Sequence, residues 1–158
     1  MVILLVAGLL PTAGYSAGVG QKAPDFSVQN ILNGKYLSLK HYKGKVVYLD
    51  FWASWCTPCL KSFPFMEQIN RKYANRGLVV IAVGLDENRD DLMAFLERTR
   101  PASFVVAHNI KGDIATRYDV QVMPSTYLIG RDGKIELRHL GFDTRDKEKL
   151  QRIIERSL

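Results

Sequence analysis

The feature that most constrains the fold of this chain is a strand-like apolar run that leads directly into a pair of cysteines. Val46–Trp52 is apolar at every position except Asp50, and the sequence WCTPC follows at residues 55–59. An apolar run of this length, rich in β-branched and aromatic residues, is typical of a buried strand. Pro58 suits the first turn of a helix, because proline has no N–H to leave unpaired there. The order strand, cysteine pair, helix indicates a redox site.

Zinc is the alternative for two cysteines at this spacing, and the rest of the sequence disfavours it. A structural zinc ion takes four ligands, usually thiolates and imidazoles. Cys56 and Cys59 are the only cysteines, and the three histidines, His41, His108 and His139, are scattered along the chain. The sequence therefore predicts dithiol chemistry, with no metal and no cofactor.

The predicted helix makes the two cysteines unequal. Cys56 would lie at or just before the first turn, where unpaired N–H groups and the helix dipole favour an anion. Such motifs can lower a thiol pKa from near 8.5 to roughly 7 or below. Cys59 would lie one turn deeper, so we expect Cys56 to attack and Cys59 to resolve. Thr57 and Pro58 are expected to tune the redox potential, and because they place no cation between the cysteines we expect a reductant.

The residues around this motif resemble a known family. Residues 50–59, DFWASWCTPC, together with Pro64 and the later MPST at residues 123–126, resemble thioredoxin-fold thiol:disulfide oxidoreductases. APDF at 23–26, LSL at 37–39 and YKGKVV at 42–47 are similar to the exported TlpA/ResA-like (redoxin) type. The resemblance covers nearly all of the chain from Gly20 onward. It implies an α/β fold: a thioredoxin-like mixed β-sheet flanked by helices, with an N-terminal β-hairpin and a central insertion.

Asp50 is the most informative residue outside the cysteines. An ionised carboxylate within an apolar strand is costly, so its pKa is expected to be raised. The resemblance to thioredoxins implies a general base that takes the proton of Cys59. TlpA/ResA-type proteins usually lack this acid, and many carry a glutamate at the position of Ser62; the thioredoxin lysine is replaced by Ala82. The alternative is an acid at a strand edge that reaches water.

The resemblance also implies a substrate-binding loop. It predicts a cis bond between Met123 and Pro124, packed against the cysteine pair, with the backbone of Met123 pairing with an extended substrate. The alternative is a simple turn at the start of a strand. Trp55 is expected to form an apolar rim for docking, whereas Trp52 is expected to pack in the core.

The N-terminal residues predict export. Val2–Leu10 is an apolar run too short to cross a bilayer, which needs roughly 20 residues, and small residues follow it. We interpret residues 1–19 as a signal-peptide remnant or export segment and residues 20–158 as one thioredoxin-like domain. No basic residue precedes Lys22, so a buried terminal strand or helix is the alternative. Export places the protein in the periplasm or elsewhere outside the cytoplasm, with tethering through a further N-terminal segment as an option.

The net charge and the motifs of the sequence indicate which classes of partner to expect. The net charge is +6 and the C-terminal part is basic, which fits a solvated helix face, with acidic proteins or an anionic membrane as alternatives. Nothing resembles a nucleic-acid module. We expect a monomer that acts on disulfide-bearing client proteins and receives electrons from a membrane or periplasmic thiol donor. A peroxiredoxin-like peroxide reductase and a non-catalytic thioredoxin-like binding module are the competing functions.

Hydrophobic periodicity and turn residues place the other elements. Asn33 and Gly34 predict a hairpin between strands at 26–29 and 35–38. A helix over 57–74 would bury a face that begins at Leu60, and Asn88 and Thr144 are expected to cap later helices. Further strands are expected at 78–84, 104–107, 125–129 and 134–140, with a short helix at 112–118.

Overall fold

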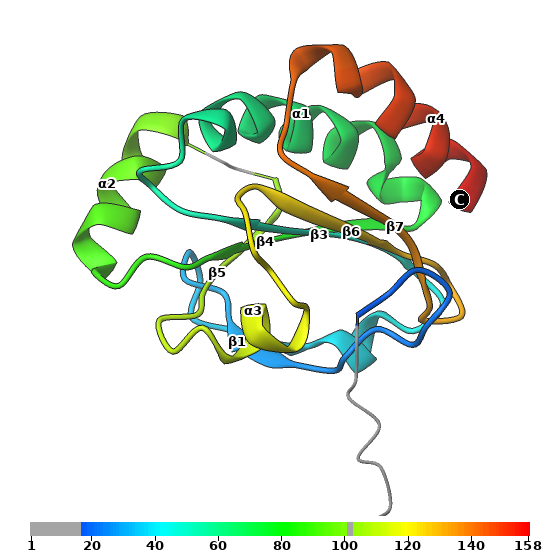
Figure 1. The fold of residues 1–158 in the computed structure, drawn as a ribbon, viewed down its shortest axis with the longest axis horizontal. Coiled ribbons are helices and arrows are strands. Elements are labelled where there is room, and N and C mark those ends of the chain that lie inside the picture. The colour runs from blue at the N-terminus through cyan, green and yellow to red at the C-terminus, as the bar shows by residue number, and fades with distance from the viewer. Residues whose placement is uncertain (1–16, 101–102) are drawn as a thin grey trace, which may run out of the picture.

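A computed structural model of the chain describes residues 17–100 and 103–158. Its centre is a five-stranded sheet in the order β5-β4-β3-β6-β7 (Figure 1). β3 is the middle strand, parallel to β4 and antiparallel to β6, so the sheet is mixed as predicted. The strands of the structure are β1 Ser27–Gln29, β2 Tyr36–Ser38, β3 Val46–Trp52, β4 Leu78–Gly84, β5 Val105–His108, β6 Ser125–Ile129 and β7 Ile135–Leu140.

Helices cover both faces of this sheet. In Figure 1, α1 and α4 lie above the sheet, whereas α3 and the β1–β2 hairpin lie below it. α2 packs on the same side of the sheet as α1, and residues of both helices belong to one apolar cluster. The helices are α1 Thr57–Tyr73, α2 Arg89–Thr99, α3 Asp113–Arg117 and α4 Lys147–Ser157, with short 3-10 turns η1 Leu39–Tyr42, η2 Ala74–Arg76 and η3 Thr144–Asp146.

Every residue of β3 is buried, because this strand is covered by helices or the hairpin on both faces. Successive side chains of a strand point to opposite faces. Tyr48 and Trp52 belong to the cluster under α1, α2 and α4, whereas Leu49 and Phe51 belong to the cluster over α3 and the hairpin. Asp50 therefore points toward the α1 face.

The N-terminal hairpin is present as expected. β1 and β2 pair antiparallel, and Gly34 in their connection has the positive φ of 72° that glycine tolerates. Beyond β1, the Ile31 N–H donates to the Val106 carbonyl, so the chain covers the open edge of β5. α2 and β5 occupy the middle of the chain, between β4 and α3, in agreement with the predicted central insertion.

Two details of the helices differ from prediction. Leu60 is 43% exposed, because the buried face of α1 begins at Cys59 and continues through Ser62 and Phe63, and Leu60 lies beside that face. Thr144 does not cap the last helix. Asp143 caps the 3-10 turn η3 that precedes α4, its carboxylate accepting the Arg145 N–H, and the N-cap of α4 itself is Asp146, whose side chain makes no capping bond. Asn88 caps α2 as predicted, accepting from the Asp90 N–H.

Most of the predicted export segment, residues 1–16, lies outside the described residues. The described part begins at Ala17, whose side chain is buried against the α3 face of the sheet. Residues 20–23 then pair with the start of β7, through Gly20 N–H to Ile135 O and Ile135 N–H to Gln21 O. Over 17–100 and 103–158, no helix has the length and apolarity that crossing a bilayer requires.

Candidate redox site

The two cysteines form a disulfide at the start of α1. Their Cα atoms are 5.3 Å apart. Cys56 is the N-cap residue, with an extended backbone, and its N–H donates to the Ala53 carbonyl. Cys59 lies within the first turn and is fully buried, whereas Cys56 keeps 5% of its surface exposed. Cys56 is thus the more accessible sulfur-bearing residue of the pair.

The start of α1 can stabilise a thiolate on Cys56. No side chain caps this helix, and Pro58 contributes no N–H. The unpaired positive end of the helix dipole is therefore left to the residue at the N-cap. Thr57 and Pro58 are exposed between the cysteines. The arrangement suits reversible formation and opening of a disulfide.

Asp50 is buried beneath the same helix, with 1% of its surface exposed. The Thr126 hydroxyl donates a 2.6 Å hydrogen bond to Asp50 Oδ1, and within the described residues Oδ2 has no partner. Burial raises the pKa of Asp50 to about 7, and the bond from Thr126 opposes that rise. A carboxyl with this pKa can accept and return a proton near neutral pH.

Neither the lysine of thioredoxins nor the glutamate of many TlpA/ResA-type proteins is present near Asp50. Ala82 lies directly opposite Asp50 in β4, so no lysine faces the carboxyl from that position. The Ser62 hydroxyl donates to the carbonyl oxygen of Cys59, 3.0 Å away, and supplies no acid there. Asp50 is therefore a buried acid on the face of β3 against which α1 and Cys59 pack.

The loop before β6 packs against the disulfide region. The bond between Met123 and Pro124 is cis, as the resemblance implied. Met123 packs against the apolar cluster that contains Cys56 and Cys59. The Pro124 carbonyl accepts from the Gly141 N–H at 2.8 Å, whereas the N–H and C=O of Met123 have no hydrogen bond to other described residues. The backbone of Met123 is thus free to pair with a bound chain.

Apolar side chains are exposed around this loop and the motif. Trp55 is 71% exposed, and Trp52 is fully buried against the rings of Phe63 and Phe95, as predicted. Sequence reasoning missed Val122 and Leu140, which are 47% and 51% exposed. They were not identifiable from periodicity, because only the tertiary pairing of β6 with β7 brings Leu140 beside the cis-proline loop.

Asp86 is a further residue that the sequence did not identify. It follows β4 and is only 2% exposed. Both carboxylate oxygens accept the Ser54 N–H, at 3.0 and 3.1 Å, and Nε2–H of His108 donates to the Asp86 carbonyl at 2.7 Å. Asp86 thus fixes the turn that carries Trp55 and Cys56. Its one sequence signal was an acid directly after an apolar strand.

We predict that Asp86→Ala destabilises the protein by about 2 kcal/mol, because the partly buried Ser54 N–H loses a charged acceptor. Asp86→Asn keeps an oxygen acceptor and should cost less. Urea unfolding measures both losses. Glu87→Ala, which removes the exposed neighbouring acid, is the control and should change stability by less than about 0.5 kcal/mol. Equal stability of the Asp86→Ala and Glu87→Ala proteins would show that the Ser54 contact contributes nothing.

Metal ligation finds no support in the described geometry. Across 17–100 and 103–158, no three His, Cys, Asp or Glu side chains gather closely enough to hold an ion. Both cysteines are joined to each other.

Comparison with known families places the chain among redox proteins. Residues 18–154 match the family model described as Redoxin. The chain is 36% identical to the thiol-disulfide oxidoreductase ResA of Bacillus thuringiensis subsp. konkukian over 87% of this chain and 78% of that protein. It is 38% identical to the thioredoxin-like protein YneN of Bacillus subtilis, over 85% of this chain and 78% of that protein.

Solved structures show the same architecture. A protein of Chlorobium tepidum assigned as a thiol:disulfide interchange protein, DsbE, superposes with a TM-score of 0.84 at 45% identity, covering 89% of this chain and 97% of that chain. The exposed lipoprotein thioredoxin Etrx1 of Streptococcus pneumoniae gives a TM-score of 0.73 at 28% identity, covering 84% and 99%.

Proposed function

Because this chain belongs to the redoxin family and is a thiol-disulfide oxidoreductase of the ResA and DsbE type, we propose that it reduces disulfides of exported client proteins. The observation that carries this proposal is the Cys56–Cys59 disulfide at the start of α1 above the buried Asp50. Apocytochromes, whose haem-attachment thiols must be reduced, are one client class, in keeping with cytochrome c maturation.

The proposed reaction has two exchanges. The Cys56 thiolate attacks one sulfur of a client disulfide, which forms a bond between Cys56 and the client and releases the other client sulfur as a thiolate. Asp50 accepts the proton of Cys59, whose thiolate then attacks Cys56. The second client thiol leaves, and the protein is left with the Cys56–Cys59 disulfide. An external dithiol must supply two electrons before the next cycle.

Client binding would use the cis-proline loop. The N–H and C=O of Met123, which have no hydrogen bond to other described residues, support strand-like pairing with an extended client segment, because both groups remain available to the backbone of a bound chain. Pro124 holds the loop in place through its bond to Gly141. The exposed ring of Trp55 supplies apolar contact area beside Cys56. The backbone pairing is independent of client sequence.

We propose that the protein works outside the cytoplasm, as a monomer, with a membrane or periplasmic thiol protein as its electron donor. The resemblance to the exported TlpA/ResA-like type and the apolar run Val2–Leu10 support export. Among the structural neighbours, Etrx1 is an exposed lipoprotein. Thr57 and Pro58 would set the reduction potential without a cation near the thiolate.

We predict that the protein catalyses reduction of insulin by dithiothreitol and does not consume peroxide. Its reduction potential should lie nearer the roughly −270 mV of thioredoxin than the roughly −120 mV of DsbA. Insulin turbidity, a peroxide assay and equilibration with glutathione measure these properties. A potential above about −160 mV would overturn the reductant assignment. Peroxide turnover would identify a peroxiredoxin-like enzyme, and inactivity in both assays a binding module.

A further inference from the structure

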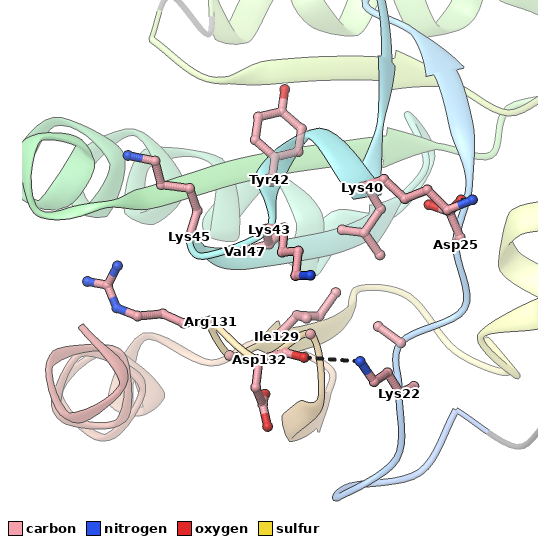
Figure 2. Close-up of a pocket in the computed structure, with 14 residues that line it drawn as sticks. Lys22, Asp25, Lys40, Tyr42, Lys43, Lys45, Val47, Ile129, Arg131 and Asp132 are labelled. Atoms are coloured by element: carbon pink, nitrogen blue, oxygen red, sulfur yellow. Dashed lines mark hydrogen bonds and ion pairs between the residues drawn. The ribbon is translucent and has the colours of Figure 1, made fainter.

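A cationic cavity lies at the end of the central strands that is opposite the disulfide. Its volume is about 290 Å³, and its walls come from residues 22–25, the segment 39–47 and the β6–β7 turn. Leu39, Val47 and Ile129 supply apolar lining. Figure 2 shows the ammonium groups of Lys22 and Lys43 pointing into the space between these segments. The cavity thus combines an apolar interior with a basic opening.

Basic side chains outnumber acids around this cavity. Five cations and two carboxylates line it: Lys22, Lys40, Lys43, Lys45, Arg131, Asp25 and Asp132. Some of the cations are already engaged. Arg131 donates to three backbone carbonyls, and Lys40 pairs with Asp25 at 2.9 Å. Lys43 and Lys45 are exposed and have no side-chain hydrogen bond or ion pair to other described residues. Their charges remain available to an anionic partner.

The cavity cannot serve the redox reaction directly. Lys45 immediately precedes β3, whereas Cys56 follows its other end. Seven strand residues at roughly 3.3 Å each separate the two ends of β3 by about 20 Å. A client bound in the cavity would hold its own disulfide away from Cys56. The cavity therefore lies on a surface that can bind a partner while the Cys56–Cys59 disulfide remains accessible to clients.

The segment that follows the apolar run Val2–Leu10 also crosses this surface. Ala23 N–H donates to the Gly133 carbonyl, so Lys22 and Ala23 form one wall next to the β6–β7 turn. The six residues between Leu10 and the buried Ala17 can span about 25 Å at most. Any membrane that holds the run Val2–Leu10 would therefore lie near the domain surface that residues 17–23 cross.

We propose that this cavity and its cationic opening bind the anionic headgroups of a phospholipid membrane, with the disulfide edge facing away from the bilayer. A membrane fits better than an acidic protein client, because the surface lies opposite Cys56 and beside the segment that leads from the apolar run. A short apolar segment alone gives weak attachment, and a basic surface supplies the second signal that stable attachment needs. Contacts must be close, since salt screens charges beyond about 8 Å.

Vesicle sedimentation of the full oxidised chain tests the proposal. The parent should bind phosphatidylcholine vesicles that contain phosphatidylglycerol more tightly than pure phosphatidylcholine vesicles, and added salt should reduce the difference. Lys43→Gln with Lys45→Gln should weaken binding to the anionic vesicles about 30-fold, because each lysine near an anionic surface contributes roughly fivefold. Insulin reduction by this variant should stay at the parent rate, which separates this proposal from the redox function.

A matched pair of substitutions controls for net charge. Lys61→Gln with Lys111→Gln removes the same two charges at the opposite edge, since Lys61 follows Cys59 and Lys111 follows the end of β5. This variant should keep most of its binding. Equal losses in both variants, or equal binding to neutral and anionic vesicles, would overturn the proposal. So would saturation by inorganic phosphate without any preference for anionic vesicles, which would identify a soluble-anion site.

Discussion

Replacement of Cys56 by serine is expected to abolish disulfide exchange completely. Cys56 is the N-cap of α1 and the more exposed of the two cysteines, so its thiolate is the one that the helix dipole stabilises and a client can reach. A serine hydroxyl neither ionises near neutral pH nor forms a disulfide. Insulin reduction with dithiothreitol should fall to the uncatalysed rate.

Replacement of Cys59 by serine should have a different outcome, and the two variants control for each other. The first attack by Cys56 still occurs, but no second thiol resolves the product, so mixed disulfides with the client should accumulate. Non-reducing gels and intact-mass measurement detect them, and circular dichroism shows whether both variants remain folded. Stable mixed disulfides through Cys59 in the Cys56→Ser protein would reverse the two roles.

Local sequence patterns predicted the elements that hold this site. The run Val46–Trp52 and the motif at 55–59 gave β3 and the start of α1 within a residue. They did so because a fully buried strand and a helix with proline in its first turn leave strong compositional signals. The cis bond before Pro124 could be expected only from the family resemblance, since X-Pro bonds are usually trans.

Contacts between distant segments were not predictable in the same way. The Thr126 hydroxyl reaches Asp50 across 76 residues of sequence, and Asp86 reaches Ser54 across 32. Both depend on the order of strands in the sheet, which periodicity does not specify. Leu60 shows the opposite failure: its spacing fits the buried face of α1, yet Cys59 takes the buried position of the first turn and Leu60 stays exposed. Hydrophobic patterns in the sequence therefore predict where the helices and strands lie, whereas the order of strands in the sheet decides which side chains contact one another.

Asp50→Asn is expected to slow the resolving step by roughly 10²–10⁴-fold and to leave the first attack by Cys56 nearly unchanged. General-base assistance has about this value when the base is well placed, and the amide cannot take the Cys59 proton. The parent's resolving rate should rise with pH around a midpoint near 7, where Asp50 ionises. Stopped-flow reduction of a disulfide substrate across pH measures both steps.

The same substitution should change how stability depends on pH. Burial raises the pKa of Asp50 from 3.8 to about 7 in the folded state, so the folded protein binds this proton more tightly than the unfolded chain does. The contribution of Asp50 to stability is therefore greatest below pH 4, falls as pH rises toward 7, and changes no further above it. Asp50 should cost the oxidised protein roughly 3 kcal/mol between pH 5 and pH 8. Urea unfolding of Asp50→Asn should lack this loss.

Variants of Thr126 separate the proton-accepting role of Asp50 from a purely structural one. The Thr126 hydroxyl favours the ionised carboxylate, so Thr126→Val should raise the pKa of Asp50 and move the midpoint of the resolving rate to higher pH, whereas Thr126→Ser keeps the hydroxyl and should stay near the parent. A structural role would alter unfolding without moving that midpoint. If Asp50→Asn reproduces the parent's rate and pH profile, Asp50 is only a tolerated buried acid, and Cys59 must lose its proton to another acceptor.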